Sequence, residues 1–139
     1  MTFDEVQSLV AHAIGASPLA RRLGMAVATV EPDRVRVRLP FDADNTTIGD
    51  LIHGGAIAAL VDVTATATAW STTDLPASPQ GTTIGFSVSF VAGARGCDLV
   101  AEGRIVRRGR QITVCDVDVT DPDGGTVARA LVTYKLSGR

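Results

Sequence analysis

The segment His53-Gly-Gly-Ala-Ile-Ala-Ala-Leu-Val-Asp62 opens with paired glycines, continues as small apolar residues and ends on a single carboxylate. The apolar run extends to Trp70 without a turn signal, and that length favours a buried helix. The part from Val61 to Ala69 also alternates as a strand would, and its threonines and valines lower the helix propensity. Small side chains let other backbone pack closely, so we predict a helix over residues 55–70 that is wrapped by a sheet.

The glycines and the carboxylate together suggest a site for attack on a carbonyl group. Gly54 and Gly55 let a ligand approach bare N–H groups at the start of a helix, where unpaired amides carry partial positive charge. Such donors can polarise a carbonyl and hold an oxyanion. Asp62 lies among leucine and valine neighbours, where its charge is costly to bury unless something pairs with it or uses it. The alternative is that the glycines only form a turn and Asp62 faces water.

The rest of the chain predicts one further helix and six strands. Apolar residues recur at three- and four-residue spacing from Phe3 to Ile14, which predicts an amphipathic helix that Gly15 and Pro18 end. Strands are predicted at 25–31, 34–39, 82–91, 99–107, 112–120 and 127–136. This order predicts an α+β fold with an antiparallel sheet around a long central helix. The 139 residues fit one domain, 1–139, with an N-terminal helix and lead-in at 1–18.

Composition argues against several classes of function. The net charge of −2 offers no general attraction to nucleic acid or to an anionic membrane. The apolar run from Ala56 to Ala69 is too short and too polar to span a bilayer, and no signal-type stretch begins the chain. Cys97 and Cys115 show no metal-site spacing, so we expect reduced thiols and a cytoplasmic protein. His53 has no second ligand at metal spacing, and we expect no metal.

His-Gly-Gly followed by Leu-x-Asp, with the aspartate nine residues after the histidine, resembles the signature of hotdog-fold thioesterases of the phenylacetate-degradation (PaaI-like) type. The resemblance covers about Leu19 to Leu136, including the segments Asn45–His53 and Gly81–Phe90. It implies the hotdog fold and the hydrolysis of an acyl-CoA to a free acid and coenzyme A, with no cofactor. It also implies a homodimer at minimum and a homotetramer as the expected assembly.

The resemblance implies roles for four residues around the predicted helix. The amide of Gly54 would hold the oxyanion, and Asp62 would act as general base for water or as nucleophile. Thr66, one turn after Asp62, would help to place the water, or it would bond a carbonyl of its own helix. Thr83 would contribute a hydroxyl beside the carboxylate, or it is an ordinary strand threonine.

Two residues before the glycines complete this set of candidates. His53 is expected to orient the loop and the thioester rather than to act as a base, and a capping or packing histidine is the alternative. Many relatives carry Asn or Gln six residues before the histidine, where this chain has Thr47. Asn45 lies eight residues before it, and a longer loop could return Asn45 to that role. Gly55 is expected to supply a second amide toward the substrate.

Three arginines are candidates for binding coenzyme A. Arg107, Arg108 and Arg110 surround a glycine at a predicted strand turn. A fork of guanidinium groups suits the pyrophosphate and the 3′-phosphate of coenzyme A, and the resemblance places basic residues here for that purpose. The alternative is a solvated run of surface charge.

The helix itself indicates how many chains build a site. Gly54 and Asp62 are eight residues apart, which corresponds to about 12 Å along a helix. One carbonyl carbon cannot lie within about 3.5 Å of Asp62 and still accept a hydrogen bond from Gly54 of the same helix. If both residues act, they act from two chains related by a two-fold axis, so the chemistry implies a dimer.

Three functions compete at this point. An acyl-CoA thioesterase would use Asp62 for hydrolysis, and the acyl group is small or medium, including aromatic groups. A non-catalytic hotdog protein would bind acyl-CoA without turnover, but it has no use for a carboxylate beside a thioester. A hotdog dehydratase acting on enoyl-CoA would pair a carboxylate with a histidine at a different spacing.

Overall fold

The computed structural model describes residues 1–138. Its elements, in chain order, are α1 (Phe3–Ala16), α2 (Pro18–Arg22), β1 (Ala26–Glu31), β2 (Arg34–Leu39), a 3₁₀ turn (Ala43–Asn45), α3 (Gly54–Trp70), β3 (Pro79–Phe90), β4 (Leu99–Arg108), β5 (Ile112–Thr120) and β6 (Thr126–Gly138). No helix among residues 1–138 is long and apolar enough to cross a membrane.

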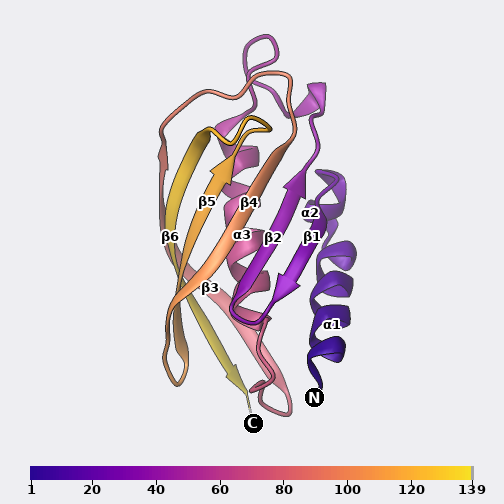
Figure 1. The fold of residues 1–139 in the computed structure, drawn as a ribbon, viewed down its shortest axis with the longest axis vertical. Helices are drawn as coiled ribbons and strands as arrows, with labels where there is room; N and C mark the ends of the chain where they lie inside the picture. The colour runs from indigo at the N-terminus through magenta and orange to yellow at the C-terminus, as the bar shows by residue number, and fades with distance from the viewer. Residues whose placement is uncertain (139) are drawn as a thin grey trace.

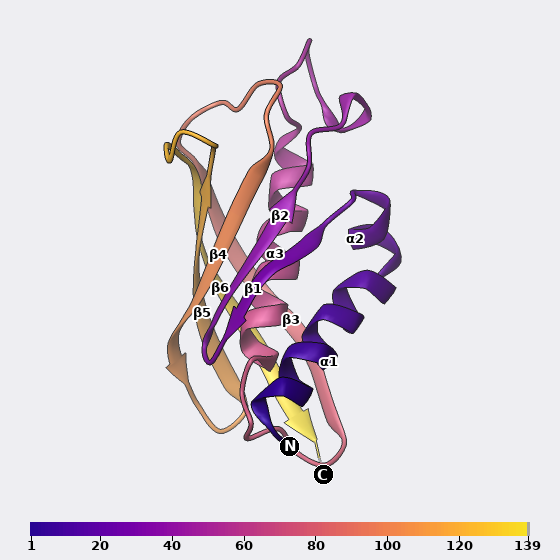
Figure 2. The same ribbon diagram turned by 45° about the vertical axis from the view of Figure 1, so that its right-hand side comes forward.

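The strands form one six-stranded sheet in the order β1-β2-β4-β5-β6-β3, and every neighbouring pair is antiparallel. The sheet curves around α3, which runs along its concave face (Figure 1). Helix α1 packs on β1 and on α3 beside this sheet (Figure 2). The predicted α+β hotdog fold, a sheet wrapped around a long central helix, is confirmed.

Helix α3 forms despite its strand-like alternation because the sheet buries most of its surface. Nine of its residues are buried, and Leu60, Val61 and Ala65 are completely so. Two of its buried polar groups are satisfied within the helix, since the hydroxyls of Thr64 and Thr68 each donate to a carbonyl four residues earlier at 2.7 Å. Tertiary packing therefore outweighs the low helix propensity of valine and threonine.

The predicted first helix is confirmed, and it ends at Ala16, between the two residues that were expected to end it. Helix α1 continues through Gly15 to Ala16, and Ser17 caps it by donating its N–H to the carbonyls of Ala13 and Ile14. Pro18 also opens the short helix α2, which the sequence pattern did not predict. Proline is favoured at the first position of a helix, where its missing N–H costs nothing. The strands that were predicted at 82–91 and 127–136 also begin earlier, as β3 and β6.

Helix α3 and the sheet make a close contact at Gly103 on β4. A Cβ added at this glycine would overlap the hydroxyl of Thr68 and would lie 3.3 Å from Cγ2 of Thr64. The backbone of β4 thus rests directly on two threonines of α3. Only a residue without a side chain allows this approach.

We expect Gly103→Ala to lower the free energy of unfolding by about 1–3 kcal/mol, because the added methyl group overpacks the contact with Thr68. Urea denaturation at constant protein concentration measures the change. Gly15→Ala is the control, since a Cβ at Gly15 meets nothing within 4 Å and alanine favours a helix. A Gly103→Ala variant as stable as the wild type would contradict the close packing of β4 on α3.

Candidate active site

Asp62 lies in the middle of α3, half-buried, and is held by the neighbouring strand. The hydroxyl of Thr83 on β3 donates to Oδ1 of Asp62 at 2.6 Å. The pairing of β3 with β6 shifts register between Thr83 and Gly85, and such bulges re-aim side chains. The structure therefore brings together two predicted site residues that are 21 positions apart, and it fixes one oxygen of the carboxylate.

The two glycines at the start of α3 differ in what their amides do. His53 is the N-cap residue, and its Nδ1 accepts the N–H of Gly55 at 2.7 Å. The N–H of Gly54 has no hydrogen-bond partner within residues 1–138. Gly54 thus presents the unpaired amide at the positive end of a long helix, whereas the Gly55 amide is already bonded.

The cap also explains why the second residue of the pair is a glycine. A Cβ at Gly55 would lie 2.9 Å from Nδ1 of His53, so a side chain there would push the ring away. A ring nitrogen that accepts a hydrogen bond carries no proton, which places the proton of a neutral His53 on Nε2. His53 is therefore a capping residue in this structure, which was the alternative considered for it.

Gly54 opens onto a hollow of about 350 Å³ between the start of α3 and the end of β3. The ring of Phe90 lies above it, with Cζ 3.5 Å from the position of a Cβ at Gly54. Thr47, which stands where many relatives have Asn or Gln, lines the same hollow. The unpaired amide is thus reached from an apolar cleft rather than from a flat surface.

The longer loop does bring Asn45 to the start of α3. Its backbone carbonyl accepts the N–H of His53 at 2.8 Å. Its side-chain amide nitrogen is buried and has no hydrogen-bond partner within residues 1–138. Asn45 also lines a hollow of about 290 Å³ together with His53 and Gly55. A buried amide donor without a partner is costly, and a water or ligand oxygen would satisfy it.

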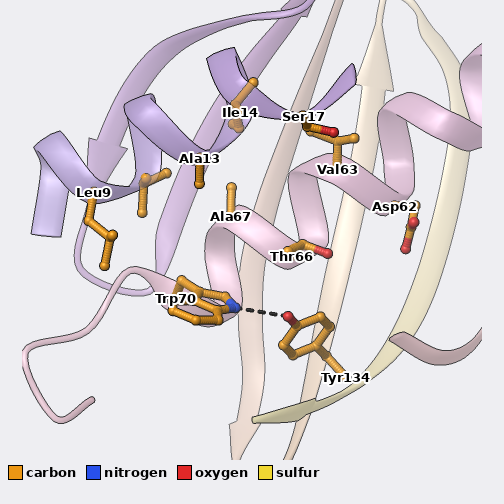
Figure 3. A pocket seen from close by; sticks show the side chains of 11 residues that line it. Leu9, Ala13, Ile14, Ser17, Asp62, Val63, Thr66, Ala67, Trp70 and Tyr134 are labelled. Carbon is orange, nitrogen blue, oxygen red and sulfur yellow. Dashed lines mark hydrogen bonds between the residues drawn. The ribbon is translucent and has the colours of Figure 1, made fainter. Parts of the chain in front are cut away.

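A cavity of about 310 Å³ adjoins Asp62 between α1 and α3 (Figure 3). Thr66 lines it, and within residues 1–138 its hydroxyl makes none of the back-bonds seen at Thr64 and Thr68. Thr66 therefore has a hydroxyl to offer to the cavity, one helical turn from Asp62. The structure favours the interpretation of Thr66 as a cavity residue over that of a back-bonded threonine.

Two aromatic residues that are hydrogen-bonded to each other also line the cavity. Nε1 of Trp70 donates to the hydroxyl of Tyr134 on β6 at 2.8 Å (Figure 3). Burial raises the pKa of Tyr134, and the charge of Asp62 raises it further. Sequence reasoning missed this cavity, because the apolar residues of α1 that form its other wall have the spacing of ordinary core positions.

The three arginines of the predicted fork have different environments. Arg108 donates to the carbonyl of Ala69, the penultimate residue of α3, at 2.9 Å and to Asp33 at 2.7 Å. Arg107 and Arg110 are exposed and form no ion pair within residues 1–138. Arg110 lines a polar hollow of about 520 Å³ beside the β4–β5 hairpin. Arg108 thus links distant parts of the fold, whereas Arg107 and Arg110 remain available to bind a ligand.

No group of three or more side chains that could hold a metal ion is found within residues 1–138.

The model of the thioesterase superfamily matches residues 49–128, so the chain belongs to this superfamily. The match includes the start of α3, Asp62 and strands β3 to β5. The chain is accordingly a hydrolase of the thioesterase class, and the resemblance to hotdog thioesterases is confirmed at that level.

Curated relatives and solved structures agree with this assignment. A protein of Halobacterium salinarum named "Putative esterase" is 29% identical over 122 residues, covering 86% of this chain and 80% of the relative. The Escherichia coli PaaI protein from the phenylacetic acid degradation operon has the same fold, with a TM-score of 0.82, 20% identity and coverage of 99% and 97%. A Streptococcus mutans protein bound to acetyl-CoA has a TM-score of 0.74 and 26% identity, with coverage of 83% and 90%.

Proposed function

We propose that this chain hydrolyses the thioester bond of an acyl-CoA and releases a carboxylic acid and coenzyme A. The observation that carries the proposal is the Asp62 carboxylate, which Thr83 holds and which lines a mostly apolar cavity. The oxygen of water bonds to the carbonyl carbon, the carbon–sulfur bond breaks, and the sulfur leaves as a thiolate that takes up a proton. Asp62 either removes the proton from the attacking water, or it first attacks the carbonyl itself, displaces the thiolate and forms a mixed anhydride that water then hydrolyses to the acid and free Asp62.

The Gly54 amide is the proposed oxyanion donor, because the Gly55 amide is occupied by His53. Asn45 is the second candidate donor, since its buried side-chain amide has no partner within residues 1–138. Donors that are fixed in advance stabilise the developing charge without reorganisation. His53 contributes by holding the turn that presents Gly54.

We propose that each site is shared between two copies of the chain. Strand β3 is an edge of the sheet, and it exposes Ile84, Phe86 and Phe90. An unpaired apolar edge favours pairing with another strand, whereas the opposite edge, β1, is packed against α1. Two-fold pairing of β3 with its copy inverts the second α3 and brings the partner's start of helix toward Asp62.

The homodimer is the minimum assembly under this proposal, and a homotetramer is the assembly expected from the family resemblance. Light scattering on the purified protein measures the mass directly. We further propose that residues 1–139 act as one domain in the cytoplasm, a compartment in which Cys97 and Cys115, both without a disulfide partner, stay reduced.

The function is tested by thiol release from a panel of aryl-CoA and aliphatic acyl-CoA thioesters. Hydrolysis above the uncatalysed rate is expected for at least one thioester. Calorimetric binding of acyl-CoA without any release of thiol would instead indicate the alternative function, a non-catalytic acyl-CoA-binding protein.

The available arginines are proposed to bind the phosphates of coenzyme A. We expect Arg107→Ala with Arg110→Ala to raise KM for acyl-CoA about tenfold, which corresponds to about 1.4 kcal/mol. Contacts made equally in the ground and transition states change KM rather than kcat. Steady-state kinetics with an acyl-CoA and with the matching thioester that lacks the nucleotide measure the effect.

Arg108→Ala is the matched control, because its guanidinium already bonds Asp33 and the Ala69 carbonyl. This variant is expected to lower the melting temperature more than it raises KM. Equal effects of the double variant on both substrates would mean that Arg107 and Arg110 are only surface charge.

A further inference from the structure

The cavity between α1 and α3 is lined by one carboxylate, by two aromatic residues and by apolar residues of both helices. Asp62 and Trp70 line it eight residues apart on α3, and the ring of Tyr134 lies beside that of Trp70, to which it is hydrogen-bonded (Figure 3). The wall contributed by α1 includes Leu9 and Ala13, which are apolar. A small apolar space that begins at a reactive carboxylate is suited to the hydrocarbon part of a substrate.

We infer that this cavity receives the acyl group and that Trp70 and Tyr134 together set the longest chain it accepts. This inference rests on the proposed thioesterase function and names its substrate class, a medium straight-chain acyl group of octanoyl size. From Asp62 to Trp70 is eight residues, or about 12 Å along α3. The volume of about 310 Å³ lies at the lower end of the range for ligand sites, roughly 300–1,000 Å³.

The part of the cavity wall that Trp70 and Tyr134 form is tightly packed. Tyr134 is 3% exposed, and it packs in a cluster with Ala69 and Leu136. A Cβ at Gly81 on β3 would overlap the Tyr134 hydroxyl, so the ring lies directly on that glycine. The hydrogen bond from Trp70 then couples the indole to a ring that has no room to move. A chain longer than the cavity must displace both rings, which costs packing energy.

The α1 wall offers a site at which the cavity can be filled without disturbing the core. Ala13 lines the cavity but is exposed, so a larger side chain there would project into the space rather than into the core. Ala11, on the same helix, is also exposed and does not line the cavity. Ala13→Leu and Ala11→Leu are therefore matched substitutions that differ only in whether the new side chain meets the acyl group.

The first experiment compares kcat/KM for octanoyl-CoA and acetyl-CoA. Ala13→Leu is expected to lower the octanoyl-to-acetyl ratio at least about tenfold, the scale on which one methylene in an apolar pocket is discriminated. Ala11→Leu is expected to leave the ratio unchanged. Trp70→Ala is expected to raise the dodecanoyl-to-octanoyl ratio by about the same factor. An unchanged ratio in folded Ala13→Leu protein, shown by circular dichroism, would overturn the inference.

The second experiment needs no turnover. Trp70 is the only tryptophan in the chain, so its fluorescence reports on the cavity alone. The thioether S-octyl-CoA, which cannot be hydrolysed, is expected to shift the emission of Trp70 to the blue, and S-ethyl-CoA is not. Identical spectra with both saturating compounds would overturn the inference. A blue shift in a protein that hydrolyses no acyl-CoA would refute the proposed catalysis while supporting the acyl site.

Discussion

The Asp62→Asn variant is expected to hydrolyse acyl-CoA with a kcat at least about a hundredfold below that of the wild type, the scale of losing a catalytic base. Asparagine has nearly the same shape and still offers an oxygen to the Thr83 hydroxyl, so the fold and the position of the side chain persist. The substitution removes the group that accepts a proton or attacks the carbonyl. Substrate affinity, measured as KM in the same steady-state assay, is expected to change little.

Thr83→Val is the control for this experiment. Valine keeps the volume of threonine and removes the hydroxyl that orients Asp62. The carboxylate remains, so the loss in kcat is expected to be smaller than in Asp62→Asn. Turnover near the wild-type rate in Asp62→Asn would remove Asp62 from the mechanism.

Two inactive variants, Asp62→Ala and Gly54→Pro, are expected to restore activity when they are unfolded and refolded together. Random pairing yields about half mixed dimers. Each mixed dimer has one site with an intact Asp62 and an intact Gly54, and one site with both defects. The mixture is therefore expected to recover about a quarter of wild-type activity, provided the two defects act independently.

The start of α3 tolerates the proline that this experiment needs. Gly54 is the first residue of the helix, where proline is favoured, and its N–H has no partner within residues 1–138. His53 is already extended, with φ −62° and ψ 131°, as the residue before a proline prefers. A refolded mixture that exchanges subunits and stays inactive would show that the site does not cross the interface.

The fold follows from the sequence because hydrophobic periodicity and turn residues agree along most of the chain. The ambiguous stretch from Val61 to Ala69 is a helix because a sheet surrounds it, and its length without a turn signal predicted that outcome. Helix α2 was not predicted, because the proline that follows the end of one helix can also be the first residue of another. Only the packing of the residues after the proline shows whether a second helix begins there.

The sequence predicted which residues form the site. It did not predict how neighbouring residues of the same type differ in their hydrogen bonds. Gly54 and Gly55 are the same type of residue. Their amides differ because the His53 ring, placed by the loop, accepts a hydrogen bond from the N–H of Gly55. Thr66 and Thr68 differ only in which side of α3 they occupy. Such distinctions depend on tertiary contacts, which a single sequence does not contain.

Arg108 has a further consequence for how the protein unfolds. Its partners lie 75 and 39 residues away in the chain, and the Asp33 turn also donates its N–H to Ser71 at 3.1 Å. Closing loops of this length costs chain entropy, so we expect these contacts to form late in folding. A contact absent from the transition state for folding acts on the unfolding rate. We therefore expect Arg108 to lengthen the lifetime of the native state more than it speeds its formation.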